Sequence, residues 1–498
     1  MSGNAMTNAF STRAQLAILL VYAGMIAFIV PYHEPWTDET TPWMMMREVS
    51  FAQLSEATHN LGYTMLWHLM LTPFARAGLP FETIYVIHGI IAVAMVAVVL
   101  RFAPFSRTTK LLWTFSNLIL YQYAVLARPY SLTSLMLFTV AAIYPLRFTR
   151  PMLYAAAVFM LFEGHVIVFM VPCALTAAYL WEMWRNGRME KRQVAAFLLM
   201  VAGCLVAVYQ LRPPQDPDHM FHGFANLFRG EGFVVGLSDG WLPYALLDAS
   251  DNRNDLMIII TVLMPLLIPL VVINDHIKKT VPVFIFVLAM LWMAYVFMFK
   301  FPGTFWHHGL AIQVTLFSLW LASYYKGEAK HQGREWVLIN LCLLYGCVLT
   351  PFLYYKDYIY PFSAGKAAAA FIRKNHLEDR ILISDRLEAM TPYLPKGACN
   401  WVPYARRCIN YDTWDAAFYI YRKQRKIEGI EHPALTIAKE VFGDFSGKVV
   451  MLQRPATEDE RKRYGLVLVF CESGIQDDAW IYLPEGDFKK LAGKLILR

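Results

Sequence analysis

The chain has 498 residues, of which 57% are hydrophobic and 17% are charged, and its net charge is +7. Soluble domains carry roughly 25% charged residues, so this composition excludes an ordinary soluble protein; the mean hydropathy of +0.38 agrees. The modest positive balance favours loops that orient helices in a membrane and contact anionic lipid, not nucleic-acid binding. We therefore expect a polytopic α-helical membrane protein.

A short polar lead precedes the apolar run 14–30, and no small-residue cleavage site follows this run. We predict a first membrane span there, not a cleaved signal peptide. The next segment, 31–60, is polar, acidic and rich in aromatic residues. Its first part contains three carboxylates: Glu34, Asp38 and Glu39.

A carboxylate at a bilayer surface costs free energy, because the low dielectric constant disfavours its charged form. We therefore interpret Asp38 as a general base, with Glu39 as its neighbour in a catalytic pair. The alternative is that both residues cap the short helix predicted after them, since acidic side chains favour helix N-termini. The sequence leaves both interpretations open.

Basic turns separate the later apolar runs and orient the chain under the positive-inside rule. They contain Arg101, Arg107, Lys110, Arg147, Arg150, Arg185, Arg188, Lys191, Arg192, Lys278, Lys279, Lys326, Lys330 and Arg334. If segment 61–77 crossed the membrane, the turn 101–110 would lie outside, against this pattern. We therefore predict that 61–77, interrupted by Pro73, lies along the outer interface. The first external loop, 31–82, then contains two interfacial helices.

The length rule for apolar runs predicts about eleven transmembrane helices within residues 1–355. They lie at 14–30, 83–100, 111–127, 130–147, 151–163, 165–184, 194–212, 255–274, 280–299, 304–325 and 336–355. The odd number places the N-terminus in the cytoplasm and the chain after residue 355 outside, for a multi-pass protein of the inner (plasma) membrane. The fifth span is short, and Glu163-Gly164-His165 is interpreted as the junction of two half-helices.

From residue 356 the composition is that of a soluble domain. We predict a helix at 363–375, strands at 380–384 and 448–453, a helix at 457–464 and a strand at 466–471. This alternation favours a small extracytoplasmic α/β domain over 356–498. It has no glycine-rich phosphate loop, so we expect a lid or an acceptor-docking module. Cys399 and Cys408 are close enough in sequence to pair in an oxidising compartment.

Ionisable residues between spans are candidates for function, because they are costly near a bilayer. The guanidinium fork of Arg128 suits a phosphate group, or it snorkels to lipid head groups. We expect Glu163 and His165 either to contact substrate or to form hydrogen bonds with the backbone at helix ends. His307 and His308 are candidates to bind a donor phosphate or to take up a proton, or they line an interface.

The external loop 213–254 contains Asp216, Asp218, His219 and His222. Such a set could bind a divalent metal, but these side chains are usually solvated in an external loop, so we expect no metal and no cofactor. The residues expected to contact substrate are Glu34, His59, Tyr130, Glu163, His165, His219 and His222.

The acidic pair Asp38-Glu39, the Ala-Arg-x-Tyr turn at 127–130, the long external loop and the external C-terminal domain together resemble the C-type membrane glycosyltransferases (GT-C). The likeness is to protein O-mannosyltransferases and lipid A aminoarabinose transferases, over residues 10–355; the C-terminal domain has no counterpart. It implies that Asp38 is the catalytic base and that Arg128 contacts the donor phosphate, assisted by His307 or His308. The family often has an acid two residues after this arginine. Tyr130 stands there instead, which argues against a metal-bridging carboxylate.

The resemblance implies an inverting enzyme that moves a hexosyl or pentosyl group from a polyprenyl-phosphate donor to a lipid, glycan or protein acceptor on the extracytoplasmic face. One alternative is a lipid-linked glycan polymerase or ligase that uses a diphosphate-linked donor. Another is a flippase or transporter of a lipid-linked sugar. A transporter should place ionisable groups near the middle of the membrane in two corresponding halves, and the sequence has no such repeat.

Overall fold

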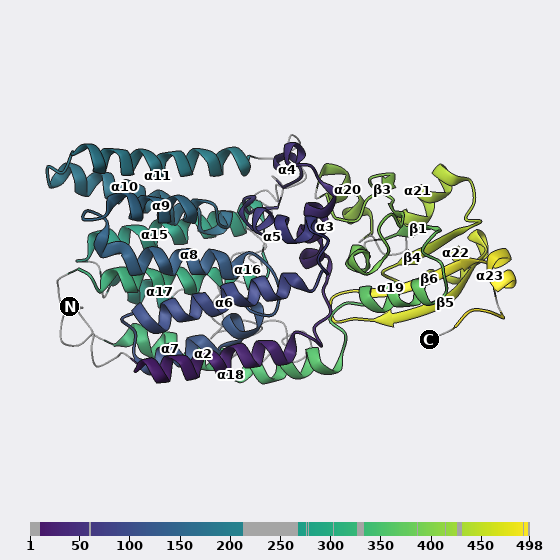
Figure 1. Ribbon diagram of the computed structural model, residues 1–498, viewed down its shortest axis with the longest axis horizontal. Helices are drawn as coiled ribbons and strands as arrows, with labels where there is room; N and C mark the ends of the chain where they lie inside the picture. Colours follow the sequence, from purple (N-terminus) through teal and green to yellow (C-terminus); the bar gives the residue numbers. More distant parts are fainter. Residues whose placement is uncertain are drawn as a thin grey trace.

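The computed structural model describes residues 10–58, 61–212, 267–274, 276, 278–301, 303–325, 333–385, 387–413, 415–425, 431–491 and 493–496. A bundle of roughly parallel long helices forms one part of the molecule. A small domain with a β-sheet forms the other part, at one end of the bundle (Figure 1). The described N-terminal residues begin at the far end of the bundle from this domain.

Within the described residues, six helices are long and apolar enough to cross a membrane. They are Thr12–Ile29 (α2), Thr83–Phe102 (α6), Val166–Arg185 (the 3₁₀-helix η3, Val166–Val168, and α10, Met170–Arg185), Lys191–Gln210 (α11), Thr280–Lys300 (α15, Thr280–Tyr295, and the π-helix η6, Val296–Lys300) and Glu335–Ile359 (within α18, Arg334–Ile359). A helix of twenty residues is about 30 Å long, which matches the hydrocarbon thickness. All six fall on predicted spans, but the count of eleven is not confirmed.

The other predicted spans are shorter or interrupted. Helices α8 (Tyr130–Ile143, extended to Leu146 by η2, Tyr144–Leu146) and α9 (Pro151–Phe162) are apolar but short. The segment 111–127 contains the end of α7 (Arg107–Phe115), an extended residue at Ser116 and the π-helix η1 (Leu118–Gln122). The segment 304–325 contains α16 (Phe305–His308) and α17 (Leu310–Ala322). Of 255–274, only the helical residues 267–274 are described.

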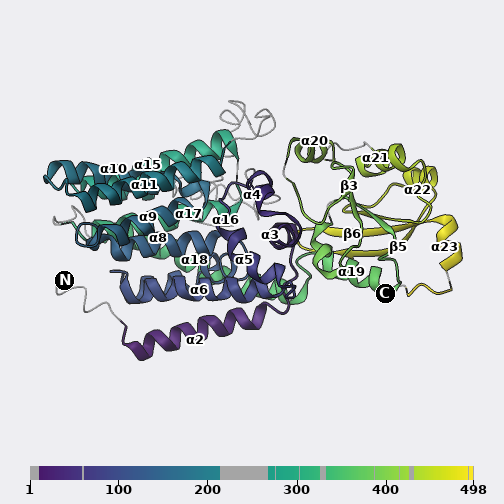
Figure 2. The same ribbon diagram turned by 45° about the horizontal axis from the view of Figure 1, so that its top comes forward.

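The first loop contains three short helices where the sequence predicted two. They are α3 (Thr37–Glu48), α4 (Phe51–Thr58) and α5 (Leu66–Arg76), and they lie between the bundle and the C-terminal domain (Figures 1 and 2). The eleven residues of α5 span about 16 Å, which is too short to cross a bilayer. The break after Phe162 also matches the predicted junction of half-helices, because α9 ends there and η3 begins at Val166.

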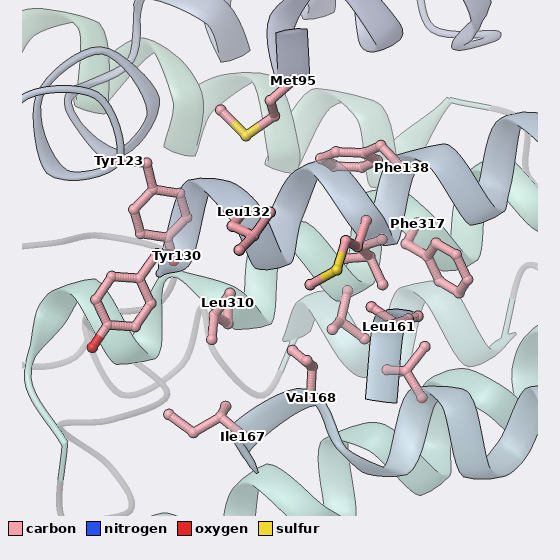
Figure 3. Packing of buried hydrophobic residues seen from close by; sticks show 14 of the residues in the cluster. Met95, Tyr123, Tyr130, Leu132, Phe138, Leu161, Ile167, Val168, Leu310 and Phe317 are labelled. Carbon is pink, nitrogen blue, oxygen red and sulfur yellow. The ribbon is translucent and has the colours of Figure 1, made fainter. Parts of the chain in front are cut away.

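The core of the bundle is packed around α8. Figure 3 shows the rings of Tyr123 and Tyr130 near the start of this helix, with Leu310 of α17 and Val168 of η3 close by. The two tyrosine rings are stacked with centroids 5.5 Å apart, and both side chains are fully buried. Close packing of this kind resists displacement, so it holds the chain between η1 and α8 in place.

The C-terminal domain is a six-stranded mixed sheet in the order β3-β2-β1-β4-β6-β5. The strands are β1 (Ile381–Ser384), β2 (Asn400–Val402), β3 (Arg407–Cys408), β4 (Lys448–Leu452), β5 (Leu466–Ser473) and β6 (Asp478–Pro484). Strand β1 is parallel to β2 and β4, and the other pairs are antiparallel. Successive residues of β4 alternate between two hydrophobic cores, as the pleat of a strand requires. Val449 and Met451 face one core, and Val450 and Leu452 face the other.

Helices cover both faces of this sheet. One core includes α19 (Gly365–Lys374), and the other includes α20 (Ala416–Arg425) and α21 (Pro433–Phe442). The remaining helices are η7 (Glu388–Tyr393), α22 (Glu458–Tyr464) and α23 (Glu485–Leu491). The five predicted elements correspond to α19, β1, β4, α22 and β5. The sequence did not predict strands β2, β3 and β6 or helices η7, α20, α21 and α23. Strands β2 and β3 have three and two residues, which are too few to show a period of two.

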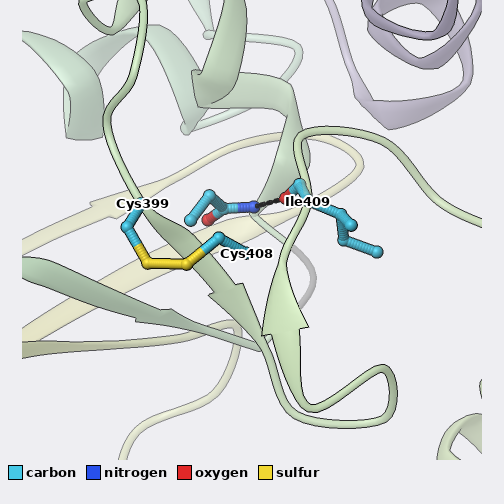
Figure 4. The surroundings of a disulfide bond; sticks show 4 residues. Cys399, Cys408 and Ile409 are labelled. Carbon is cyan, nitrogen blue, oxygen red and sulfur yellow. Dashed lines mark hydrogen bonds between the residues drawn. A yellow bond between two sulfur atoms is a disulfide. The ribbon is translucent and has the colours of Figure 1, made fainter. Parts of the chain in front are cut away.

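A disulfide joins Cys399, which precedes β2, to Cys408 of β3 (Figure 4). The pairing that the sequence left open is therefore present. Beside it, the side-chain amide of Asn400 donates to the carbonyl oxygen of Ile409 at 2.8 Å. Disulfides persist in oxidising compartments, which agrees with the prediction that this domain is extracytoplasmic.

We expect residues 79 and 108 to lie on opposite sides of the membrane, because the twenty-residue helix α6 separates them. Single cysteines at Leu79 and Thr108, both exposed, are to be labelled with an impermeant maleimide in intact and in opened cells. The background carries Cys471→Ser, since Cys471 is free and exposed. Labelling of both positions from the same side would contradict the predicted topology.

Candidate functional site

The turn between η1 and α8 is the centre of the candidate site. It ends in the sequence Ala127-Arg128-Pro129-Tyr130, and Pro129 precedes the first residue of α8, a position at which its missing N–H costs no helical hydrogen bond. The imidazole of His88, buried in α6, lies 3.2 Å from the carbonyl oxygen of Ala124 and 3.0 Å from that of Arg128. His88 of α6 therefore contacts the backbone that carries Arg128 and helps to fix its position.

Asp38, in the first turn of α3, forms an ion pair with Arg128. One Nη2–Oδ2 distance is 3.0 Å, and the two side chains are 13% and 10% exposed. Charges so far removed from water attract each other more strongly than surface charges. The two residues that the sequence singled out separately, ninety positions apart, thus belong to one site.

Three aromatic rings surround the guanidinium of Arg128. Its central carbon lies 5.5 Å from the ring centroid of Trp36, 5.2 Å from that of Tyr130 and 5.1 Å from that of Trp306. The rings come from the first loop, from α8 and from α16, and the two indoles touch edge to face. Cation–π contacts of this kind keep the charge in place without occupying its N–H groups.

Four buried hydrogen-bond donors of this cluster have no partner within the described part of the chain. They are Nη1 of Arg128, the hydroxyl of Tyr130 and the indole nitrogens of Trp36 and Trp306. Buried polar groups are normally paired, since an unpaired one costs about 1–3 kcal/mol. A guanidinium and an indole only donate, so the group that satisfies them must be an acceptor, and the positive charge favours an anion.

Two of the predicted histidines adjoin this cluster. The ring of Tyr130 stacks on His165 at 5.3 Å and meets His307 edge to face at 5.4 Å, and the two imidazoles are 5.6 Å apart. His308 instead packs against Phe297, with ring centroids 4.7 Å apart. The contacts of the described residues therefore place His165, His307 and Tyr130 with Arg128.

Glu39 is fully buried, and both of its carboxylate oxygens accept hydrogen bonds. The backbone N–H of Ala127 donates to Oε1 at 2.7 Å, and the backbone N–H of Trp36 and the imidazole of His33 lie 3.3 and 3.0 Å from Oε2. The bond to Trp36 is a helix cap, as the structural alternative expected. Glu39 thus connects the first loop to the Arg128 turn, which is a structural task, whereas Asp38 faces the cationic cluster.

His33 links Glu39 to Asp357 at the end of α18. Its Nδ1 lies 2.9 Å from Oδ2 of Asp357, and all three side chains are buried. Burial by itself would lower the pKa of His33, but the carboxylates of Asp357 and Glu39 outweigh it and raise this pKa to about 10. The imidazole is therefore cationic at neutral pH and sits between two anions.

The remaining predicted residues are not in contact with Arg128 in the described structure. Glu34 lines a separate cavity of about 330 Å³ together with Asp357 and Glu472. Oε2 of Glu163 accepts from the amide of Gln210 at 2.7 Å. His59, His219 and His222, and the rest of the loop 213–254, lie outside the described residues. No group of three or more metal-ligating side chains occurs within the described ranges.

Sequence reasoning missed His33, His88 and Asp357. His33 precedes the acidic pair by only five positions, and a histidine beside carboxylates is a recognisable signal. His88 lies within an apolar run, and Asp357 lies near the end of another. An ionisable residue at such a position costs free energy, so it is a candidate for function. Their partners, however, are distant in sequence.

A carboxylate beside a cluster of unpaired donors can accept a proton from a nucleophile while the donors hold an anion. Comparison of the chain with protein-family models, with curated proteins and with solved structures gave no match.

Proposed function

We propose that the chain is an inverting glycosyltransferase that uses a polyprenyl-phosphate sugar. The observation that carries the proposal is the ion pair between Asp38 and Arg128 within a cluster of unpaired donors. A phosphate monoanion or dianion offers several acceptor oxygens, which suit Nη1 of Arg128 and the neighbouring hydroxyl and indole groups. The apolar helices around the cluster suit the isoprenoid chain.

In the proposed reaction the acceptor hydroxyl attacks the anomeric carbon of the donor. A new carbon–oxygen bond forms as the bond from that carbon to the phosphate oxygen breaks, and the configuration inverts. Asp38 accepts the hydroxyl proton. The leaving phosphate keeps the electron pair and is stabilised by Arg128. Because the phosphate competes with Asp38 for the guanidinium, donor binding weakens the ion pair and leaves the carboxylate available as a base.

Asp38 is preferred to Glu39 as the base, because both oxygens of Glu39 already accept hydrogen bonds from the protein. The phosphate role of His308, whose ring packs against Phe297, stays a prediction. His307 and Tyr130 remain in that role. The sugar and the acceptor are not assigned.

A diphosphate-linked donor is the second candidate. The observation that favours it is the pair His165 and His307, whose imidazoles adjoin Tyr130 and extend the cluster beyond Arg128. Mass spectrometry of lipid copurified with the protein decides between the two. A lipid monophosphate supports the first candidate, and a lipid diphosphate supports a polymerase or ligase.

We expect Arg128→Lys to raise the donor KM at least about tenfold. A point charge replaces a planar fork, and a hydrogen bond to a charged group is worth about 1.5–3 kcal/mol. The measurement is sugar transfer from a radiolabelled polyprenyl-phosphate donor in proteoliposomes, over a range of donor concentrations.

Arg147→Lys is the matched control. Arg147 also pairs with a carboxylate, Glu182, and also lies over an aromatic ring, that of Tyr144, but it follows the opposite end of α8. The control should keep the donor KM of the parent protein. An unchanged donor KM in Arg128→Lys, at normal expression, would remove the phosphate role of Arg128.

A further inference from the structure

A cavity of about 660 Å³ lies on the side of the bundle between α2 and α6, the two helices that run beside each other at its edge (Figures 1 and 2). Its walls are small or aliphatic, and include Ala23, Ala27, Gly89 and Val93. Val86 and Ile90, which also line it, are 63% and 65% exposed. Because both helices are long enough to span a membrane, these walls face hydrocarbon chains and not water.

One end of this groove is polar and is bordered by the C-terminal domain. Lys366 of α19 and Tyr393 of η7 reach it from that domain, and Tyr85 and Glu82 from the start of α6. Tyr85 is only 6% exposed, and its hydroxyl has no hydrogen-bond partner within the described part of the chain. A buried phenol normally has one, so this hydroxyl is suited to pair with a polar atom of a ligand.

The polar end carries one lysine, Lys366, and one carboxylate, Glu82. Both are exposed, and neither forms an ion pair among the described residues, although the charge of Lys366 also acts on the carboxylate of Glu34. The nearby imidazolium of His33 is already balanced by Glu39 and Asp357. A ligand head group with one anionic and one cationic centre therefore matches this end, and a purely anionic head group would leave its charge beside Glu82.

We propose that the groove binds a membrane aminophospholipid, phosphatidylethanolamine. Its acyl chain lies between α2 and α6, its phosphate meets Lys366 and the hydroxyl of Tyr85, and its ammonium meets Glu82. The lipid thereby joins the first and second spans to the C-terminal domain. This site is distinct from the Arg128 cluster and does not depend on the proposed transfer reaction.

The test uses the full chain in vesicles of phosphatidylethanolamine and phosphatidylglycerol. Either lipid in turn carries a photoactivatable diazirine on one acyl chain, and labelled peptides are identified by mass spectrometry. We expect phosphatidylethanolamine to label α2 and α6, and Gly89→Trp to abolish this labelling by filling the groove. A Cβ atom added at Gly89 meets no atom within 4 Å, and the same holds for Gly24, which is exposed on α2 and does not line the groove. Gly24→Trp is therefore the control and should label as the parent protein does.

Charge variants test the head group. Lys366→Glu should lower phosphatidylethanolamine labelling about fivefold, as expected for loss of an exposed ion pair. Glu82→Lys should shift the preference to phosphatidylglycerol. Size-exclusion profiles and melting temperatures check that each variant is folded. Because Lys366 is exposed, we expect Lys366→Glu to fold normally, so its labelling tests the head-group contact directly.

The proposal is overturned if Gly89→Trp labels like Gly24→Trp, or if the two lipids label the groove equally whatever stands at position 82. It is also overturned if an added polyprenyl phosphate displaces the phosphatidylethanolamine probe, because the groove would then be a donor site.

Discussion

Replacement of Asp38 by asparagine is expected to lower the turnover number by about a hundredfold or more, the usual contribution of a general base. Asparagine keeps the size of the side chain and one acceptor oxygen for Nη2 of Arg128, but it does not accept a proton. Donor affinity should be unchanged or higher, because the neutral amide competes less with phosphate for the guanidinium. Single-turnover transfer and donor binding, measured on the same preparation, separate the two effects.

Glu48→Gln is the control for this substitution. Glu48 lies at the other end of α3 and accepts a hydrogen bond from the amide of Asn410 at 2.6 Å, which a glutamine oxygen also accepts. Turnover of this variant should match that of the parent protein. Near-normal turnover of Asp38→Asn would reject Asp38 as the base, since asparagine serves well near a helix N-terminus.

Replacement of His33 by phenylalanine is expected to lower the free energy of unfolding by about 3–5 kcal/mol. It leaves the carboxylates of Glu39 and Asp357 buried without their common cation, and unpaired buried charges are costly. The first loop is then no longer tied to α18. Thermal unfolding in detergent, followed by tryptophan fluorescence, measures the loss.

The same residue predicts how stability depends on pH. The folded-state pKa of His33, about 10, lies above its unfolded value of about 6.5, so the folded protein binds more protons than the unfolded chain between these values. The stabilising contribution is full below pH 6.5 and decreases as the pH rises toward 10. We expect the parent protein to lose stability over this range more steeply than His33→Phe.

His68→Phe provides the matched control. His68 is also fully buried, but neither ring nitrogen has a hydrogen-bond partner in the described structure. The substitution removes unpaired polar atoms, so it should cost little stability. Burial lowers the pKa of His68 to about 3, so the pH dependence between about 6.5 and 10 should stay intact. Equal losses in the two histidine variants would show that the link from Glu39 to Asp357 is not what stabilises the loop.

The candidate site could be predicted from the sequence only in part. Arg128 and Asp38 were both selected because charges near a bilayer are costly, and the structure brings them together. Both predictions rested on local composition. Local composition identifies a residue whose charge costs free energy near a bilayer, but it does not identify the partner of that residue. In the tie from Glu39 through His33 to Asp357, His33 and Asp357 are 324 residues apart, and no local pattern indicates such a pair.

The sequence by itself determined the six long apolar helices and the main elements of the C-terminal domain, because run length, period and charge are local properties that act on each segment separately. It also predicted, from the charge pattern, that 61–77 does not cross the membrane. The eleven-residue helix α5 lies there, but it continues through Pro73, where the sequence predicted an interruption. Only the tertiary structure decided that α7 ends at Phe115 and gives way to η1, that Glu39 is used for support, and that Trp36 and Trp306 surround Arg128. These features arise from packing between distant segments, where burial and charge pairing outweigh local preference.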